Sequence, residues 1–378
     1  MLKAGGKIEK ITKCTKVLII FIILTHISQT YLFDKETKTF FRVMVSSNSS
    51  FSEIRNLVTS NTSGGGEITN ESSCIYEVSK HRGRISVSLT QEEIVSVDNE
   101  LSKTVGEGGI YQPSSCKSKN RVAIIIPFRD REEHLKIFLR HMHPFLQRQK
   151  LEYGIYVIEL DKNITFNRAI LMNIGFVEAM KLHSYTCFVF HDVDLLPEDN
   201  GIPYSCANNP QHLSIAVDTL KYKLPKTTNF GGVSALKTEQ YRKINGMSNI
   251  FFGWGGEDDD LSQRIRSQRY VIQRPAIDIG RYTMIGHVKD PSKNPQRFCL
   301  LNSSKQRMTK DGLTSLKYDR IKIEFRPLYT LVLVRVNETE IVKSDKFLYK
   351  FYTDCVKGEA KKANVLKANN QKKAIKKV

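Results

Sequence analysis

The stretch RVAIIIPFRDR, residues 121–131, decides the fold class of this sequence. Five consecutive apolar residues, 122–126, end at Pro127 and are followed by four charged or aromatic residues. A short apolar run without alternation is typical of a strand buried on both faces. The proline and the charges indicate that a loop follows. The sequence therefore predicts a buried strand that opens into a polar loop.

The residues that follow alternate between helical and strand patterns. The segment EEHLKIFLRHMHPFL has helical spacing, residues 153–160 form a second apolar run, NRAILMNIGFVEAMKL is helical again, and residues 185–190 form a third apolar run. Strand, helix, strand, helix, strand is the pattern of a parallel α/β sheet. In such sheets ligands bind beyond the carboxyl ends of the strands.

Acidic residues stand directly after the third strand, in the sequence His191, Asp192, Val193, Asp194. Two carboxylates spaced i, i+2 at a strand end can turn toward one site, and their oxygens suit Mg²⁺ or Mn²⁺ that holds a diphosphate. A helix cap or a turn is the alternative interpretation of an isolated D-x-D. The burial of the preceding strand makes the two interpretations about equally good.

A second acidic group follows a tryptophan in FFGWGGEDDD, residues 251–260. Four carboxylates in a row are typical of a solvated helix start, because negative charge is favoured in the first turn. The glycines allow a close backbone approach, and the tryptophan offers a flat face for a sugar ring. A carboxylate beside such a face can act as a general base toward a hydroxyl group.

The chain has 378 residues, with 58 Lys and Arg against 39 Asp and Glu. This excess favours an anionic partner such as nucleic acid, a membrane surface or a phosphorylated substrate. Residues 357–377 hold eight Lys and one Glu without apolar periodicity, which predicts a solvated basic tail. No aromatic residues are interleaved with this charge, as they are in proteins that bind single strands.

The N-terminus has five lysines ahead of an apolar stretch, which predicts membrane targeting. VLIIFIIL, residues 17–24, is extended by further apolar residues to about 17, the lower limit for a spanning helix. A cleaved signal peptide is the alternative, but the lysines and the missing small-residue cleavage site favour an anchor with a cytoplasmic N-terminus. We expect a cytoplasmic tail (1–16), a signal-anchor (17–33), a luminal stem (34–73), a catalytic domain (74–345) and a basic tail (346–378).

Glycosylation signals and cysteines agree with the secretory pathway. The sequons N-x-S/T begin at Asn48, Asn61, Asn70, Asn163, Asn302 and Asn337. Six of the seven cysteines lie beyond the anchor, which fits an oxidising compartment. Composition alone leaves their pairing open.

Six motifs in order resemble the β-1,4-galactosyltransferase family of inverting, type II Golgi enzymes: PFRDR, FNRA, FVFHDVDLLP, FGGVSAL, GWGGEDDD and NPQRF. The resemblance covers about residues 74–345. It implies the GT-A fold, a Rossmann-like mixed α/β sheet in a single luminal catalytic domain that binds a UDP-sugar and Mn²⁺. It also implies a Golgi membrane location.

The resemblance assigns roles on the donor side. The nucleotide and donor sugar would be held by Pro127, Phe128, Arg129, Arg131, Phe166, Arg168, Asp192, Val193, Asp194, Asn229 and Trp254. The metal ligands would be Asp194, Met284 and His287. A thioether is an unusual ligand for manganese, and without the resemblance Met284 and His287 would both be taken for structural residues.

The resemblance also assigns the acceptor side. Asp258 would be the base for the acceptor 4-hydroxyl, and the sugar would be bound by Trp254, Gly255, Gly256, Glu257, Asp259, Arg297, Phe298 and Leu301. The segment from about 285 to 305 would be a mobile loop that orders over bound donor. The implied disulfides join Cys74 to Cys116 and Cys187 to Cys206. Cys299 and Cys355 have no assigned partners.

One departure from the family concerns the donor sugar. Galactose-transferring members have a tyrosine directly before F-G-G, where this chain has Asn229. The smaller side chain leaves room for an N-acetyl group, and removing one clash shifts preference between related substrates. The sequence thus predicts transfer of N-acetylgalactosamine (GalNAc) to terminal N-acetylglucosamine (GlcNAc), with galactose transfer on the same scaffold as the alternative.

Departures on the acceptor side widen the choice of acceptor. Lys226 replaces an aromatic residue three positions before Asn229, and Phe251-Phe252 stands where relatives have Tyr-Trp. A xylose-directed enzyme is therefore a further alternative, although the pocket at Arg297 and Phe298 favours GlcNAc.

Two other classes compete with a transferase. A basic binding protein would bind in a salt-dependent manner without metal, and the secretory features exclude nucleic acid as its partner. A two-metal nuclease or phosphatase would use water as acceptor and would have no use for the tryptophan platform. A homodimer or an auxiliary protein stays open.

Overall fold

The computed structural model describes residues 73, 74, 76, 82–90, 100–161, 164–288 and 292–375. The expected cytoplasmic tail, signal-anchor and nearly all of the stem lie outside these residues, as do the sequons at Asn48, Asn61, Asn70 and Asn163. Within the described residues, no helix is both long enough and apolar enough to cross a bilayer. Asn302 and Asn337 are described, and both are exposed.

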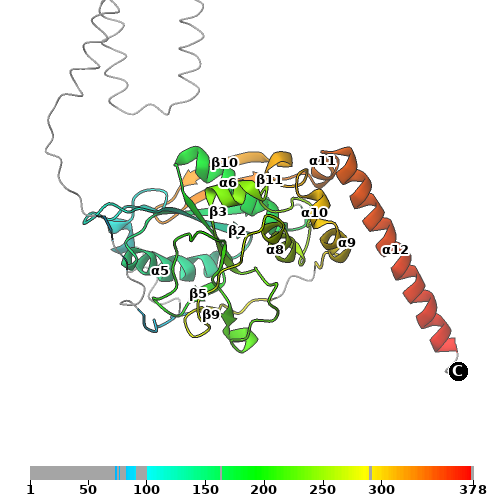
Figure 1. The fold of residues 1–378 in the computed structure, drawn as a ribbon, viewed down its shortest axis with the longest axis horizontal. Coiled ribbons are helices and arrows are strands. Elements are labelled where there is room, and N and C mark those ends of the chain that lie inside the picture. The colour runs from blue at the N-terminus through cyan, green and yellow to red at the C-terminus, as the bar shows by residue number, and fades with distance from the viewer. Residues whose placement is uncertain are drawn as a thin grey trace, which may run out of the picture. The chain divides into compact units, whose positions relative to one another are not determined.

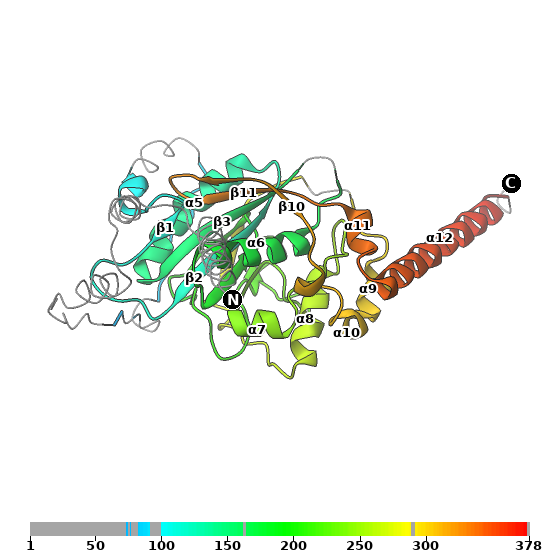
Figure 2. The ribbon, with the colours of Figure 1, turned by 90° about the horizontal axis from the view of Figure 1, so that it is seen from above.

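A mixed sheet forms the centre of the described part of the chain (Figures 1 and 2). Its strands run in the order β10-β11-β3-β2-β4-β8-β6, and β1 pairs with β3. The four central strands β11, β3, β2 and β4 are parallel, and β1, β6, β8 and β10 add antiparallel pairs. Their bounds are β1 Ile110–Tyr111, β2 Arg121–Phe128, β3 Glu152–Leu160, β4 Cys187–His191, β6 Gln211–His212, β8 Val233–Lys237, β10 Asp319–Phe325 and β11 Thr330–Arg335.

The order of elements confirms the predicted α/β class and its strand–helix alternation. Helices α5 (Glu132–Arg148) and α6 (Arg168–Leu182) cover opposite faces of the sheet (Figure 1). Alternate residues of β2 enter two separate cores: Val122 and Ile124 pack with α5, whereas Ala123 packs with α6. A strand buried on both faces needs a continuous apolar run, which explains the sequence of β2.

A smaller sheet lies at the carboxyl end of β4. It consists of β5 (Leu195–Pro197), β9 (Arg281–Met284) and β7 (Ala216–Val217), in that order, and the 3-10 helix η2 (Asp218–Leu220) follows β7. Since β5 begins directly after Asp194 and pairs with β9, this sheet brings residues 281–287 to the end of β4. The short helix α7 (Thr238–Lys243) follows β8.

The C-terminal part of the chain is helical. Helix α8 (Glu257–Ser267) carries the acidic quartet, and after β9 come α9 (Arg297–Asn302), α10 (Ser304–Arg307), the 3-10 helix η3 (Leu313–Ser315), α11 (Glu338–Val342) and α12 (Lys346–Ile375). Helices α9 and α11 both contact α12 (Figure 2). The expected basic tail is thus a helix, because alanine and lysine have high helix propensity even where no apolar stripe exists.

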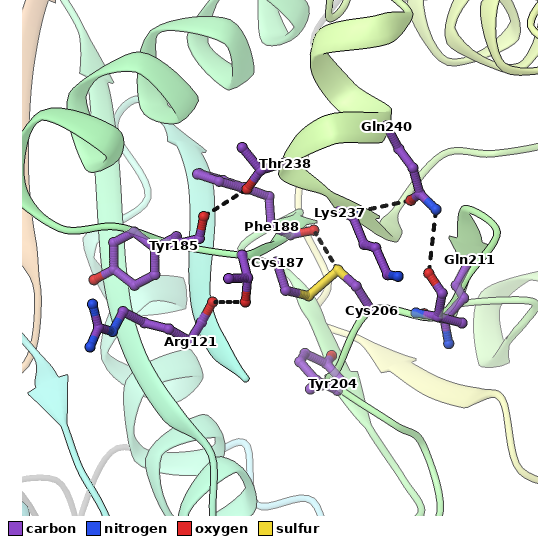
Figure 3. Close-up of a disulfide and its surroundings, with 12 residues drawn as sticks. Arg121, Tyr185, Cys187, Phe188, Tyr204, Cys206, Gln211, Lys237, Thr238 and Gln240 are labelled. Carbon is purple, nitrogen blue, oxygen red and sulfur yellow. Dashed lines mark hydrogen bonds between the residues drawn. A yellow bond between two sulfur atoms is a disulfide. The ribbon is translucent and has the colours of Figure 1, made fainter. Parts of the chain in front are cut away.

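Three disulfides occur in the described residues. Cys74–Cys116 and Cys187–Cys206 are the two pairs that the family resemblance implies. Figure 3 shows that the second joins the first residue of β4 to the loop between β5 and β6. This bond therefore fixes the start of β4, at the end of the strand opposite to Asp192. The third joins Cys299 to Cys355, which the sequence left unassigned.

Candidate active site

The carboxyl end of β2 opens into a loop that carries arginines. Pro127 and Phe128 are the last residues of β2, and both are buried beneath this loop. The Arg129 guanidinium donates to the carbonyl oxygen of Ile164 at 2.7 Å and lies 5.0 Å from the Phe166 ring centroid. Arg131 reaches the segment that follows β9 and donates to the carbonyl oxygen of Val288 at 3.4 Å.

Asp192 lies at the end of β4 and is held by Arg168, the first residue of α6. Arg168 Nε donates to Asp192 Oδ1 at 2.6 Å, and Arg168 Nη2 donates to the carbonyl oxygen of Gly232 at 3.3 Å. The side chain of Asn167 caps α6 by accepting from the backbone N–H of Ile170, which fixes the helix start that carries Arg168. Val193 is buried between the two aspartates.

Asp194 and His287 contact each other directly. Asp194 Oδ2 lies 2.9 Å from His287 Nε2, and both side chains remain partly accessible. Met284 pairs with Leu195 in the small sheet, so it lies beside Asp194. Its sulfur accepts from Thr219 Oγ1 at 3.5 Å, and its backbone N–H donates to Asp218 Oδ1 at 3.0 Å. The structure thus brings Asp194 and His287 into contact and places the backbone of Met284 opposite Leu195, the residue after Asp194.

Carboxylate oxygen and imidazole nitrogen are donors that suit Mn²⁺, so two of the three groups fit that ion. Burial raises the pKa of Asp194, and the nearby His287 opposes this rise. A divalent cation would compensate the same burial cost. The described residues contain no group of three or more His, Cys, Asp or Glu side chains arranged for a metal, and the expected set has only two such side chains.

The acidic quartet begins α8 behind glycines in left-handed conformations. Gly255 and Gly256 have φ of 105° and 99°, a region that other residues rarely adopt, and Gly256 is the N-cap. Gly231, in the FGG motif, faces the quartet: a Cβ added there would lie 2.5 Å from Asp258 Oδ2. The motif therefore has glycine because its backbone touches the Asp258 carboxylate.

Arg168 connects the two acidic groups electrostatically. Besides its bond to Asp192, its positive charge interacts with Glu257 and Asp258. Burial raises the pKa of Glu257 to about 7, and the Asp258 charge adds to that rise. Burial and the Asp259 charge also raise the pKa of Asp258, whereas Arg168 and Lys226 lower it. Glu257 Oε2 is buried without a hydrogen-bond partner among the described residues.

The other two carboxylates of the quartet have partners. Asp259 Oδ2 accepts from Lys226 Nζ at 2.6 Å. Asp260 is fully buried between Arg264 Nε at 2.6 Å and Arg307 Nη2 at 2.9 Å. Both arginines also pair with Asp311, which accepts from the backbone N–H of Asn249 at 2.7 Å. Asp260 is therefore structural.

Trp254 is the only tryptophan of the chain, and its side chain is 64% exposed. Its backbone N–H donates to the carbonyl oxygen of Ser292 at 2.8 Å, and its carbonyl oxygen accepts from Asn294 N at 3.0 Å. Phe298, on α9, is 62% exposed, and the Arg297 guanidinium lies 4.5 Å from its ring centroid. Arg297 also packs against Gly255 and Gly256, so α9 adjoins the tryptophan loop; Leu301, on the next turn, is half-buried.

Asn229 lies in a loop pinned to its surroundings. Its side-chain oxygen accepts from the backbone N–H of Gly231 at 3.2 Å, and its carbonyl oxygen accepts from Arg274 at 2.9 Å. Arg274 also holds the carbonyl oxygen of Thr227, and Ser262 of α8 donates to that of Thr228 at 2.7 Å. Asn229 is therefore placed two residues from the glycine that touches Asp258.

Sequence reasoning missed several supporting residues. Asp218 and Thr219 hold Met284, and Arg274 holds the loop of Asn229. No local pattern marks these contacts, because they join segments far apart in the sequence. The Cys299–Cys355 bond had an available signal: two assigned pairs leave these cysteines as the remaining two beyond the anchor.

Comparisons with known proteins agree with this geometry. The sequence matches the family models for the N-terminal region of glycosyl transferase group 7 over residues 74–207 and for the N-terminal domain of galactosyltransferase over residues 211–288. It is 45% identical to beta-1,4-galactosyltransferase 4 of Cricetulus griseus over 248 residues, or 65% of this chain and 71% of that protein. It is 48% identical to beta-1,4-galactosyltransferase 1 of Homo sapiens over 64% of this chain and 62% of that protein.

A solved structure is also similar. The catalytic domain of Drosophila beta1,4galactosyltransferase 7, in complex with xylobiose, superimposes with a TM-score of 0.50 at 28% identity, over 60% of this chain and 99% of that one. A variant of the same protein has been solved with manganese, UDP-Gal and xylobiose. These likenesses agree with the GT-A architecture of the sheet.

Proposed function

Because the chain belongs to the β-1,4-galactosyltransferase family of glycosyltransferases, we propose that it transfers GalNAc from UDP-GalNAc to the 4-hydroxyl of terminal GlcNAc, with inversion to a β1-4 linkage. Galactose transfer from UDP-galactose to the same acceptor is the second candidate. It is favoured by the names of the relatives, which are galactosyltransferases at 45–48% identity.

One observation carries the proposal: the Arg168 charge acts on two acidic groups for which we propose different roles. Arg168 bonds Asp192 at 2.6 Å, two residues before Asp194, and its charge also acts on Glu257 and Asp258. A transferase needs its diphosphate-binding edge and its base close together, since donor and acceptor must meet. A separate metal site or a separate acidic patch would not need this connection.

The donor assignment rests on Asn229. Its side-chain oxygen accepts from the backbone N–H of Gly231, the same glycine whose added Cβ would meet Asp258. An asparagine held in this way takes up less of the donor site than a tyrosine would, and the space suits the N-acetyl group of GalNAc.

The mechanism follows from the placement of the side chains. Asp194, Met284 and His287 would hold Mn²⁺, which a structure of the Drosophila relative contains. When bound, the ion supplies positive charge that stabilises the departing UDP. Arg129, Arg131 and Arg168 add positive charge at the same edge, and Phe128 and Phe166 shape it. Asp258 accepts the proton of the acceptor hydroxyl, while Trp254 stacks on the sugar and Glu257 and Asp259 orient it.

The acceptor would contact two groups of residues. Trp254, Gly255 and Gly256 form one group, and Arg297, Phe298 and Leu301 on α9 form the other. We further propose that the enzyme acts in the Golgi lumen as a single-pass type II protein, on glycoprotein or glycolipid glycans, since the N-terminal sequence predicts an anchor and the sequons agree with the secretory pathway.

Donor competition tests the proposal. The purified chain is assayed with Mn²⁺, a GlcNAc-terminated acceptor and equal concentrations of UDP-GalNAc and UDP-galactose. We expect GalNAc to be transferred in preference, and use of UDP-galactose alone would contradict the donor assignment. If no sugar is transferred to any sugar acceptor, the proposal that the protein is a glycosyltransferase is contradicted.

Replacing Asn229 by tyrosine tests the residue behind that preference. The larger ring should exclude the N-acetyl group and change the ratio of kcat/KM for the two donors toward UDP-galactose by about tenfold or more. Thr228→Tyr in the same loop serves as the matched control and should leave the ratio close to that of the wild type. An unchanged ratio in Asn229→Tyr would remove this residue from donor selection.

A further inference from the structure

Helix α9 carries three proposed acceptor contacts, Arg297, Phe298 and Leu301, on a very short element. It spans only Arg297–Asn302, has no side-chain cap and has no acidic residue in its first turn. One and a half turns of helix are not stable by themselves, because nucleation costs more than so few hydrogen bonds return. The position of Arg297 and Phe298 must therefore come from contacts with the rest of the protein.

Leu300 is buried in the apolar core and α9 packs on α8, and three further contacts join α9 to other parts of the chain. At its start, Arg297 packs against Gly255 and Gly256 of the tryptophan loop. At its end, the carbonyl oxygen of Leu300 accepts from the buried Arg307 at 2.8 Å. Between them, Cys299 forms a disulfide with Cys355 of α12. The disulfide is the only covalent bond of the three, and it joins α9 to α12.

The first turns of α12 are themselves anchored. The Asp345 carboxylate caps the helix by accepting from the backbone N–H groups of Phe347 at 2.8 Å and Leu348 at 3.2 Å. Tyr352 donates to Glu338 of α11 at 2.9 Å. Cys355 is only 1% exposed and lies in the same apolar cluster as Ile341, Val342 and α6. The disulfide thus connects a short helix to a fixed part of the core.

We propose that Cys299–Cys355 is a positioning element of the acceptor site, so that the first turns of α12 serve as a support for Arg297 and Phe298. This inference rests on the proposed function, because it takes these two residues as acceptor contacts. A cross-link that holds α9 in place removes the ordering that acceptor binding would otherwise require. The donor edge, at Asp192 and Asp194, has no contact with this bond.

The test compares two disulfide deletions in the full chain. Cys299→Ser/Cys355→Ser removes the proposed support, and Cys74→Ser/Cys116→Ser removes a disulfide at the amino end of the sheet. We expect the first to raise the acceptor KM about tenfold, with donor KM changed less than about twofold. The control should leave both values near those of the wild type.

A binding measurement separates positioning from general damage. Trp254, the only tryptophan, reports titration of UDP with Mn²⁺ by its fluorescence without any transfer. The first variant should bind UDP as the wild type does. If the serines prevent folding, Cys299→Ala/Cys355→Val fills the buried position with an apolar group of similar size and is tested in the same way.

Each outcome decides the proposal. A folded variant with unchanged acceptor KM would overturn it. So would a parallel rise in donor and acceptor KM, or failure of both Cys299/Cys355 double variants to fold, since the bond would then stabilise the whole domain and not the acceptor site in particular. If the wild-type chain transfers no sugar to GlcNAc, the proposed function fails as well. If the wild-type chain transfers sugar normally and the Cys299/Cys355 variant has a normal acceptor KM, only the positioning role is overturned and the proposed function stands.

Discussion

Each carboxylate at the start of α8 has different surroundings, and this difference separates their roles. Asp260 is buried between two arginines, and Asp259 is paired with Lys226. Burial raises the pKa of Glu257 to about 7, so its carboxylate is partly protonated at neutral pH. Asp258 is left as the group that touches the FGG backbone and can accept a proton there.

Removing the proposed base should therefore nearly abolish sugar transfer and leave donor binding unchanged. Asp258→Asn keeps the shape of the side chain and removes the proton acceptor, so kcat should fall by about 10²–10⁴. Titration of UDP with Mn²⁺, followed by Trp254 fluorescence, should remain within about twofold of the wild type. The exposed Asp278→Asn is the matched control. Near-normal turnover of Asp258→Asn would exclude this residue as the base.

Lys226 should set the pH at which the base becomes active. The Lys226 charge lowers the pKa of Asp258, so Lys226→Met raises that pKa. Because the base acts as a carboxylate, it is then lost at a higher pH as the solution is acidified. The acidic limb of the kcat/KM profile should move to higher pH, and Lys223→Met, an exposed lysine of the same loop, should leave it in place. A shift to lower pH, or no shift, contradicts this coupling.

At the scale of elements, the buried ion network ties α8 to α10. Asp260 and Arg264 of α8, Arg307 of α10 and Asp311 after α10 are all fully buried and paired with one another. A buried network gives little net stability compared with apolar residues, but loss of one member leaves unpaired charges.

Arg307→Met should destabilise the fold strongly. It leaves Asp260 and Asp311 short of a partner and frees the Leu300 carbonyl, so the free energy of unfolding should fall by about 3–5 kcal/mol. Urea denaturation measures the change. Lys136→Met breaks an exposed pair with Glu133 and should cost less than about 1 kcal/mol. Equal effects in the two variants would show that burial of the network is irrelevant to stability.

Local patterns predicted the elements that depend on a single segment. The apolar run of β2, the helical spacing of α6 and the acidic start of α8 follow from strand and helix periodicity. The antiparallel pairing of β8 with β4 and the docking of β9 beside Asp194 depend on contacts between distant segments. The site residues came from motifs, and the residues that hold them, such as Asp218 and Arg274, have no such signal.

The C-terminal segment shows the limit of charge patterns. A run of lysines without apolar periodicity predicted a solvated tail but gave no sign of its secondary structure, and α12 is helical over Lys346–Ile375. The absence of an apolar stripe indicates only that the helix is not buried along its whole length. A helix can still form there because its residues have high helix propensity and because its first turn is anchored. Asp345 and Cys355 supply that anchor.

At the scale of the whole molecule, ligand binding should stabilise the fold through linkage. If UDP with Mn²⁺ binds only the folded state, a ligand concentration of about 100 times Kd should add about 2.7 kcal/mol to the free energy of unfolding. Thermal unfolding should show a rise in Tm that depends on ligand concentration. Chelation of the metal, or Asp194→Asn, should remove most of that rise. An equal rise without metal would argue against Asp194 as a ligand.

The distance between Cys355 and the end of α12 has a practical consequence for protein engineering. The residues after Cys355 continue the helix to Ile375, or about 30 Å along its axis. A purification tag, a fluorescent reporter or a surface tether joined after Ile375 would thus be spaced well away from Cys355 and its bond to α9. A fusion made before Cys355 would instead cut the link to α9.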